Sequence, residues 1–307
     1  MYKSENISIK AKSIGSIALE VLSKDQDALI MSNISRGIFV KSSSRWLIFI
    51  SFDDFNSPLT LTLGEAIPLL NSVQAGTTVY FASGQLLIPQ MGINILADHG
   101  SVWKPAPRQS AQAFNADRQK RLGHFAHEVL HRKHGIGFSS LLPRFLELSV
   151  EMQPISQALV SVHENIILLQ QYIRNEKLAS AGEMLCKFLG FGEGLTPSGD
   201  DFVIGLLLSL NRWQEILLLN RDISNLNQQV VETAYQNTTT LSANLIECAT
   251  LGQGDERLIE TIDFLMCGGH RGDEVVIDLL GWGNSSGVDA FVGMAVALSA
   301  GDRKSVV

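Results

Sequence analysis

The feature that most constrains the fold of this 307-residue chain is a change of hydrophobic periodicity at residues 104–107, which read KPAP. Before this point, short runs of β-branched and aromatic residues alternate with Gly, Ser, Asn and Pro, as in a series of short strands. After it, apolar residues recur at helical spacing. Because two prolines and a polar stretch separate the two patterns, we expect a linker here. The predicted domains are residues 1–105 and residues 112–307.

The stretch before the linker has the pattern of an all-β domain. Residues 59–63 (LTLTL) alternate strictly, as in a strand with one buried face. Several short strands at such spacing favour a small β-barrel or a sandwich. Residues 66–73 are expected to form one helix, because Pro68 is tolerated in a first turn. Strands are expected over 37–41, 46–51, 59–63, 78–81, 85–88 and 93–96.

The stretch after the linker has the pattern of an all-α domain. Apolar residues keep the helical spacing nearly to the C-terminus. The chain is therefore predicted to be an α+β protein, with a β-barrel or sandwich followed by a helical domain. Helices are expected over 115–134, 144–174 with an interruption at Pro154, 176–190, 198–219, 223–250, 255–268, 272–280 and 286–300.

Composition and charge exclude several classes of protein. The net charge is −7 and no cluster of Lys or Arg stands out, so no nucleic-acid partner is expected. The most hydrophobic run, 202–210, is well short of the ~20 residues of a membrane span. No signal peptide is recognisable at residues 1–15. The three cysteines are far apart in the sequence and suit reduced, buried thiols. We therefore expect a cytoplasmic protein.

One segment resembles a zinc-binding motif. His127, Glu128 and His131 fit the pattern HExxH, in which two His bind zinc and the Glu acts as base. A third ligand at the position of the longer metzincin pattern is missing. On a helical wheel His124 and His134 join these histidines opposite the apolar face. We therefore favour a solvated histidine stripe, with a zinc hydrolase as the alternative.

Residues 190–201 read GFGEGLTPSGDD and lead into the most hydrophobic run, 202–210. Three glycines in five positions predict a backbone that bends sharply or approaches another group closely. Thr196 and Pro197 are typical of a helix start, with a capping hydroxyl and a proline at the first helical position. Free N–H groups at such a start, together with the helix dipole, favour phosphate or carboxylate.

A second segment repeats this pattern 88 residues later. When residues 196–206 (TPSGDDFVIGL) are aligned with 284–294 (NSSGVDAFVGM), one Ser, one Asp and two Gly coincide. Gly205 and Gly293 lie in apolar stretches, where glycine costs about 1 kcal/mol relative to alanine in a helix. Close helix–helix contact would explain both glycines. We infer an internal pseudo-repeat in which two helix N-termini converge on one pocket.

Asp201 and Asp289 are expected to be exposed first-turn carboxylates at this pocket, and Gly199 and Gly287 to let a ligand approach the backbone. The pocket suits a ligand that is anionic at one end and carries amide or amino hydrogens at the other. A competing interpretation is two well-capped helices, because the helix dipole alone favours acidic residues in a first turn.

Residues 237–244 (NTTTLSAN) add a third polar segment, within a predicted helix. Their hydroxyls compete with the helical backbone, so they either line the same pocket or mark a helix kink. The candidate substrate-binding residues are Gly192, Gly194, Thr196, Ser198, Gly199, Asp200, Asp201, Thr239, Ser242, Asn284, Ser285, Ser286, Gly287 and Asp289.

The segments 192–201 and 283–289 resemble the two signatures of the AllH-like family, catalogued as a domain of unknown function and linked to the oxamate carbamoyltransferase of allantoin catabolism. Residues 239–242, followed by Gly252, resemble the family pattern between the signatures. The resemblance covers roughly residues 185–300. At Asn284 the family pattern often has His, which argues against a general acid or base at this position.

The resemblance implies one subunit of a hetero-oligomeric complex that transfers a carbamoyl group between phosphate and oxamate, oxalurate or a similar small amide. The ligands it implies are carbamoyl phosphate, phosphate or an oxamate-like anion, and the partners are other carbamoyltransferase subunits. It implies neither a cofactor nor a metal, and it does not assign catalytic residues to this chain. A non-catalytic ligand-binding or scaffold subunit is an alternative with the same pocket.

Overall fold

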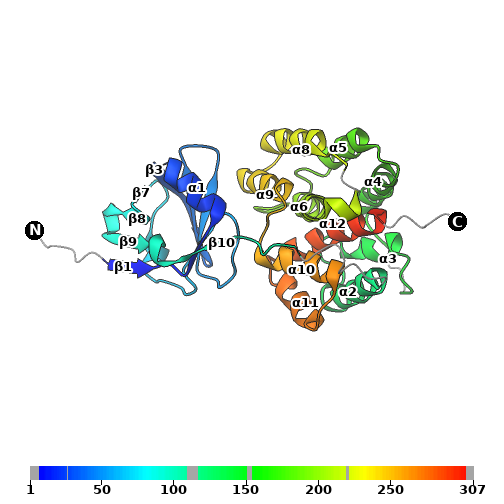
Figure 1. Cartoon of the computed structure of the whole chain (residues 1–307), viewed down its shortest axis with the longest axis horizontal. Coiled ribbons are helices and arrows are strands. Elements are labelled where there is room, and N and C mark those ends of the chain that lie inside the picture. Colours follow the sequence, from blue (N-terminus) through cyan, green and yellow to red (C-terminus); the bar gives the residue numbers. More distant parts are fainter. Residues whose placement is uncertain (1–6, 26, 109–116, 151–153, 219–220, 302–307) are drawn as a thin grey trace, which may run out of the picture. The chain divides into compact units, whose positions relative to one another are not determined.

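The computed structural model describes residues 7–25, 27–108, 117–150, 154–218 and 221–301. The chain divides into two units, Met1–Ala106 and Pro107–Val307 (Figure 1). Parts of the expected linker and of the expected helices, at residues 109–116, 151–153 and 219, lie outside the described residues. Each unit is considered by itself below.

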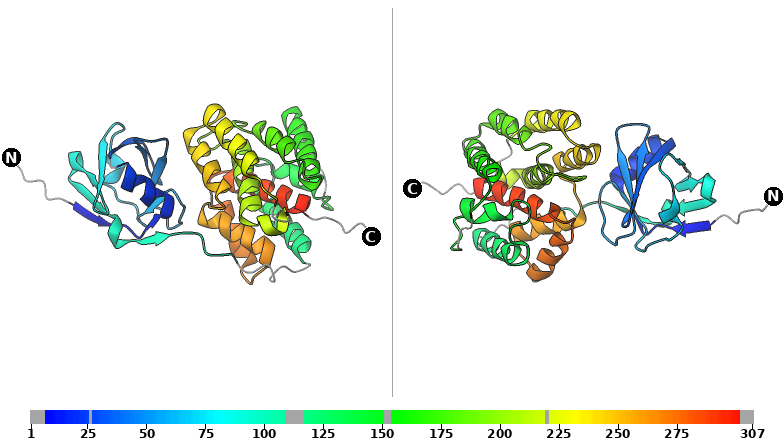
Figure 2. Two further views of the ribbon diagram at one scale, coloured as in Figure 1. Left: turned by 45° about the horizontal axis from the view of Figure 1, so that its top comes forward. Right: turned by 180° about the vertical axis from the view of Figure 1, so that it is seen from behind.

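The N-terminal unit is one mixed ten-stranded sheet in the order β1-β9-β8-β7-β3-β4-β5-β6-β2-β10. The sheet is curled into a half-barrel (Figure 2). The pairs β1–β9, β2–β10 and β5–β6 are parallel and the other pairs are antiparallel. The strands are β1 (Ile7–Lys10), β2 (Ser13–Gly15), β3 (Asp27–Ile34), β4 (Gly37–Ser42), β5 (Leu47–Ser51), β6 (Thr60–Thr62), β7 (Thr78–Ala82), β8 (Gln85–Ile88), β9 (Ile93–Leu96) and β10 (Ser101–Trp103).

All six expected strands are present, but two other expectations for this unit are wrong. Because every strand belongs to a single sheet, the unit is not a two-sheet sandwich. In place of a helix over 66–73 there is only the 3-10 turn η1 (Leu70–Ser72). The side chain of Asn33 donates to the carbonyl oxygens of Leu70 and Asn71 at 3.2 and 2.6 Å, which ties this turn to β3.

The unit also contains elements that the sequence pattern did not reveal. The strands β1, β2, β3 and β10 and the helix α1 (Ser16–Lys24) were not expected. The helix buries Ile17, Ala18, Val21 and Leu22. Inward-facing residues of the sheet, such as Ile38, Ile48 and Leu61, are fully buried and form the core of this unit.

The C-terminal unit is helical, as expected. The central helices α6 and α12 pack against each other (Figures 1 and 2), and residues 199–210 of α6 and 288–298 of α12 are all buried. A helix that is apolar on all sides lies inside a helical unit, and this explains why residues 202–210 of α6 are hydrophobic. The helices are α2 (Arg118–Lys133), α3 (Leu142–Phe145), α4 (Gln157–Arg174), α5 (Leu178–Cys186), α6 (Ser198–Arg212), α7 (Gln214–Leu217), α8 (Ser224–Asn237), α9 (Thr240–Thr250), α10 (Glu256–Cys267), α11 (Gly272–Leu280) and α12 (Ser286–Gly301).

The two faces of α2 are arranged as the sequence pattern predicted. Leu122, Phe125, Ala126, Val129 and Leu130 of α2 are buried, as the helical wheel predicted, and the opposite histidines are exposed. Within the described part of the chain, no helix is both long and apolar enough to cross a membrane. The thiols of Cys186 and Cys267 are half-buried and that of Cys248 is buried, all three free.

Candidate functional site

The helices α6 and α12 cross at two glycines. A Cβ atom at Gly205 would lie 1.9 Å from the carbonyl oxygen of Ala290, and one at Gly293 would lie 2.0 Å from that of Phe202. Real Cβ atoms do not approach an oxygen so closely, so only glycine allows this backbone contact. The close helix–helix contact expected at these two positions is confirmed. The crossing glycines lie at the middle of both helices, Gly205 in α6 (Ser198–Arg212) and Gly293 in α12 (Ser286–Gly301).

The first-turn glycines are required by packing. A Cβ atom at Gly199 would lie 2.0 Å from the carbonyl oxygen of Phe188, and one at Gly287 would lie 2.0 Å from that of Leu279. The N–H groups of these glycines donate to the preceding loops, at 2.8 Å to Phe191 and 2.9 Å to Trp282. The expectation that a ligand approaches the backbone at Gly199 and Gly287, with free N–H groups there, is therefore wrong. Carbonyl groups of the chain itself fill those places.

The cap at the first start also differs from the expectation. Helix α6 begins at Ser198, Pro197 occupies the N-cap position, and no side chain caps the helix. The hydroxyl of Thr196 lies one residue too early to act as a cap. It instead lies 3.2 Å from the hydroxyl of Ser286, the first residue of α12. The two helix starts are thus in direct contact through their hydroxyl groups.

Asp201 and Asp289 are fully buried, so the expectation of exposed first-turn carboxylates is wrong. They are buried because α6 and α12 pack against each other at the centre of the unit (Figure 1), and Gly137 and Phe138 also cover Asp289. The serines that begin the helices face these acids reciprocally. Ser286 of α12 faces Asp201 of α6, and Ser198 of α6 faces Asp289 of α12.

The carboxyl group of Asp289 is held on one side only. Its Oδ1 accepts a hydrogen bond of 2.6 Å from the N–H group of Phe138, whereas Oδ2 is buried and has no hydrogen-bond partner. A Cβ atom at Gly137 would lie 2.2 Å from Oδ1, and the positive φ of 53° at this residue also favours glycine. Burial raises the pKa of Asp289 to about 6, against the opposing effect of the Phe138 N–H group and of the hydroxyls of Ser198 and Ser285.

The carboxyl group of Asp201 is held on neither side. Both of its oxygens are buried and have no hydrogen-bond partner. Burial raises its pKa well above the usual range, and the hydroxyls of Ser286 and Thr196 oppose this only in part. The charged groups that act on it are Asp289 and Asp200, and the charge of Asp289 raises the pKa further. Burial and the neighbouring acids therefore both favour the protonated form of Asp201.

Asp200 faces the opposite side of α6 and has a structural role. Its Oδ1 accepts a hydrogen bond of 2.8 Å from the N–H group of Gly190, and its Oδ2 accepts one from the hydroxyl of Thr238. The hydroxyl of Thr239 donates to the carbonyl oxygen of Leu195 at 2.7 Å and accepts from the Ser242 N–H group at 3.1 Å.

The helix expected over 223–250 is therefore interrupted at Thr238, between α8 and α9. The break between the two helices lies at the same residues that contact Leu195 and Asp200, at the start of α6.

Other candidate residues lie further from the two acids. Gly192, Gly194 and Asn284 are exposed, with the two glycines in the left-handed region of φ. The hydroxyl of Ser242 is buried without a hydrogen-bond partner, on a helix that packs against α6. The candidates that come together around the acids are Thr196, Ser198, Asp201, Ser285, Ser286 and Asp289.

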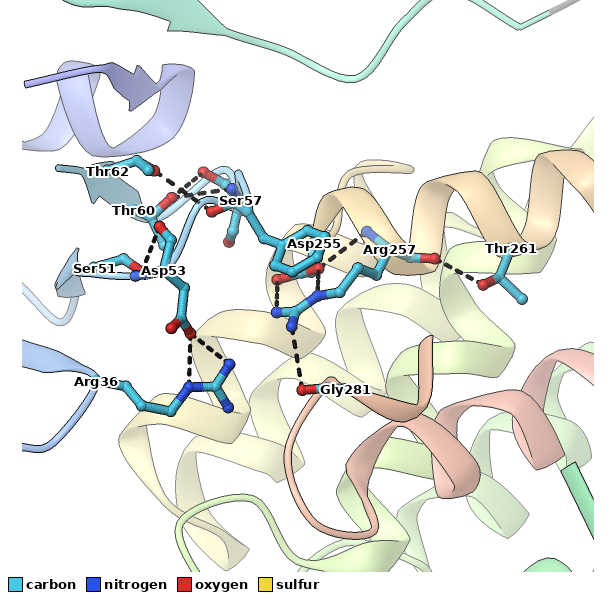
Figure 3. Close-up of polar contacts among 11 residues, drawn as sticks. Arg36, Ser51, Asp53, Ser57, Thr60, Thr62, Asp255, Arg257, Thr261 and Gly281 are labelled. Atoms are coloured by element: carbon cyan, nitrogen blue, oxygen red, sulfur yellow. Dashed lines mark hydrogen bonds and ion pairs between the residues drawn. The ribbon is translucent and has the colours of Figure 1, made fainter. Parts of the chain in front are cut away.

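A buried ion pair, which the sequence pattern did not reveal, holds the turn before α12 in place. The guanidinium of Arg257 pairs with Asp255, Nε to Oδ1 at 2.7 Å and Nη2 to Oδ2 at 2.8 Å, at the start of α10. Its Nη1 donates to the carbonyl oxygen of Gly281 at 3.3 Å, and the hydroxyl of Thr261 donates to the carbonyl oxygen of Arg257 (Figure 3). The turn that precedes α12 is thereby held to α10.

Chemically, the site combines two buried acids, four hydroxyl groups and two helix N-termini. Three carboxyl oxygens are free to bind a ligand, and the positive ends of two helix dipoles favour a ligand with negative charge nearby. Within the described ranges, no three His, Cys, Asp or Glu side chains are grouped as a metal site would require.

The sequence reading named both acids and missed Gly137 and Phe138. Their only signal was the pair of glycines at 135 and 137, directly after the histidine stripe.

Comparison with known protein families gave a match to part of this chain. The family model described as oxamate carbamoyltransferase subunit AllH matches residues 188–298. This segment runs from the residue that packs on Gly199 to the buried part of α12, and it contains both helix starts. The searches of curated proteins and of solved structures gave no match. The resemblance of this chain to the AllH family is therefore confirmed, and it rests on residues 188–298.

Proposed function

We propose that this chain is a subunit of a carbamoyltransferase complex that acts on oxamate, oxalurate or a similar small amide. The match of residues 188–298 to the oxamate carbamoyltransferase subunit AllH supports the reaction class and implies other carbamoyltransferase subunits as partners. The observation that carries the proposal is the direct contact between two matched helix starts, where two buried acids leave three carboxyl oxygens unpartnered. In native proteins such groups need an explanation, and a ligand is one.

The anionic end of the substrate binds at the hydroxyl groups of the two starts. Thr196, Ser198 and Ser286 are half-buried and lie where two helix dipoles present their positive ends. Gly199 and Gly287 each lie against a carbonyl oxygen of a preceding segment, and Gly205 and Gly293 each lie against a carbonyl oxygen of the other central helix. These corresponding contacts support an internal pseudo-repeat that builds the site from two equivalent halves.

A second candidate function is that of a non-catalytic ligand-binding subunit. The charged groups that act on Asp201 are both acidic. The pKa of Asp289 is shifted by burial and by hydrogen bonds from a backbone N–H group and two hydroxyl groups, all of them uncharged. A cationic catalytic group would then come from another subunit of the complex. The zinc alternative draws no support from His127 and His131, which are exposed on the surface of α2.

The test is a melting scan of the full chain, purified with the chains that accompany it, against oxamate, phosphate and carbamoyl phosphate. A ligand at about 100 times its dissociation constant stabilises the folded state by about 2.7 kcal/mol. We expect a rise in Tm of several degrees, since about 1 kcal/mol moves the Tm of a unit of this size by about 2–4 °C. Chloride at the same ionic strength is the control.

Variants of the helix starts make the test specific to the site. Ser198→Ala and Ser286→Ala each remove a hydroxyl at the first helical residue and should abolish most of the rise in Tm. Ser224→Ala removes the same group from the first residue of α8 and should keep it. If none of the anions raises the Tm of the wild-type complex, the proposed site is wrong.

A further inference from the structure

The two buried acids are matched in sequence but differ in what holds them. Asp289 has one oxygen fixed by the Phe138 N–H group at 2.6 Å and one free, whereas both oxygens of Asp201 are free. A backbone N–H donor stabilises the ionised form of the acid that it binds. Asp289 is therefore the carboxylate of the pair, and Asp201 is the acid that holds a proton and can donate a hydrogen bond.

We propose that Asp201 and Asp289 together bind the primary carboxamide or carbamoyl group of the substrate, an inference that rests on the proposed function. The O–H group of Asp201 donates to the carbonyl oxygen of this group. The free Oδ2 of Asp289 accepts one of its N–H hydrogens. One neutral acid and one carboxylate, close enough for the charge of Asp289 to act on Asp201, present a donor and an acceptor, which is the complement of a planar –CO–NH2 group.

Other ligand groups fit this pair less well. A carboxylate in the same place would meet the negative charge of Asp289 without a cation to offset it. A metal ion would lie against the positive ends of two helix dipoles, which disfavour a cation. The carboxamide is neutral and satisfies two of the three unpartnered oxygens. The half-buried hydroxyl groups of Thr196 and Ser286 lie next to Asp201, so they are the groups of this site nearest to solvent that face the acid.

The carboxamide can be tested by comparing oxamate with oxalate, in which a second carboxylate replaces the amide. Calorimetric titration of the co-purified wild-type complex should show oxamate binding at least about tenfold more tightly, because buried polar groups left unpaired discriminate strongly. Asp289→Asn should reverse this preference. The Phe138 N–H group keeps the oxygen of the introduced amide, so its NH2 group faces the ligand and repels the amide of oxamate but can donate to oxalate.

The proton on Asp201 is tested by a measurement that does not depend on that variant. The infrared C=O band of a protonated carboxyl group should be present in the wild type, absent in Asp201→Asn, and shifted by oxamate but not by oxalate. Asp273→Asn changes an exposed first-turn acid of α11 and should leave the band unchanged.

The possible results separate this inference from the proposed function. Equal affinity for oxamate and oxalate, or an infrared band that oxamate does not shift, would refute the carboxamide subsite and leave the anion site standing. If neither anion binds the wild-type complex, the proposed function fails, and the carboxamide subsite fails with it.

Discussion

The crossing of α6 and α12 predicts a specific penalty for adding one methyl group at Gly293. The new Cβ atom would lie 2.0 Å from the carbonyl oxygen of Phe202 and 2.8 Å from the amide nitrogen of Leu206. Both neighbours are backbone atoms of a fully buried helix, so no side chain can move aside. Gly293→Ala must therefore push the two central helices apart by more than about 1 Å, because such contacts need about 3.4 Å.

The size of the effect follows from two opposing contributions. Alanine favours a helix over glycine by about 1 kcal/mol. Overpacking a well-packed core costs about 1–3 kcal/mol, and more when backbone has to shift. Here the whole contact between the two central helices has to open, so the upper end of this range applies. We expect a net loss of about 2 kcal/mol in the free energy of unfolding.

The assay is equilibrium unfolding in urea, with the midpoint and the m-value taken from the same curves. Gly123→Ala is the matched control, because Gly123 lies inside α2 and a Cβ atom there would meet nothing within 4 Å. This control should gain stability, by up to about 1 kcal/mol. If Gly293→Ala is as stable as Gly123→Ala, the contact described at the crossing does not exist in solution.

The remaining two predictions concern the acid at the second start and the histidine stripe. Because the pKa of Asp289 is about 6 in the folded state and 3.8 in its ordinary state, its ionisation lowers stability as pH rises from about 4 to 6, by about 3 kcal/mol. Urea unfolding of Asp289→Asn should lack this loss, so a variant that follows the wild-type pH profile contradicts the assignment. The double change His127→Ala and His131→Ala should alter the free energy of unfolding by less than about 0.5 kcal/mol. It should also leave the activity of the complex unchanged, and loss of activity together with a bound metal would revive the zinc hydrolase.

Local pattern was enough to predict most of the fold. Strict alternation and turn residues located the six strands between 37 and 96, and the spacing of apolar residues located the helices. The strands β2 and β10 have three residues each, too few for a periodicity, and pair with partners far along the chain. Residues 66–73 form only a short 3-10 turn, which the side chain of Asn33, distant in sequence, ties to β3.

The candidate site was predicted in its residues but not in its environment. Repetition of Ser, Gly and Asp at the same spacing pointed to the two helix starts, which do meet. The burial of Asp201 and Asp289 could not be predicted, because it depends on how α6 and α12 cross rather than on either helix alone. The donor that fixes Asp289 comes from Phe138, about 150 residues earlier in the chain, where no local pattern records the contact.

The unpartnered oxygens at the helix starts imply that folding and binding select for different residues there. A buried polar group without a partner destabilises a folded protein by about 1–3 kcal/mol. An apolar side chain of similar size at Asp201 would remove this cost together with the proton that it holds. If a library of variants is selected only for heat resistance, we expect substitutions of Asp201 to be enriched early and to abolish activity. Efforts to stabilise the protein should leave both acids intact and change helical positions with open space around them, such as Gly123.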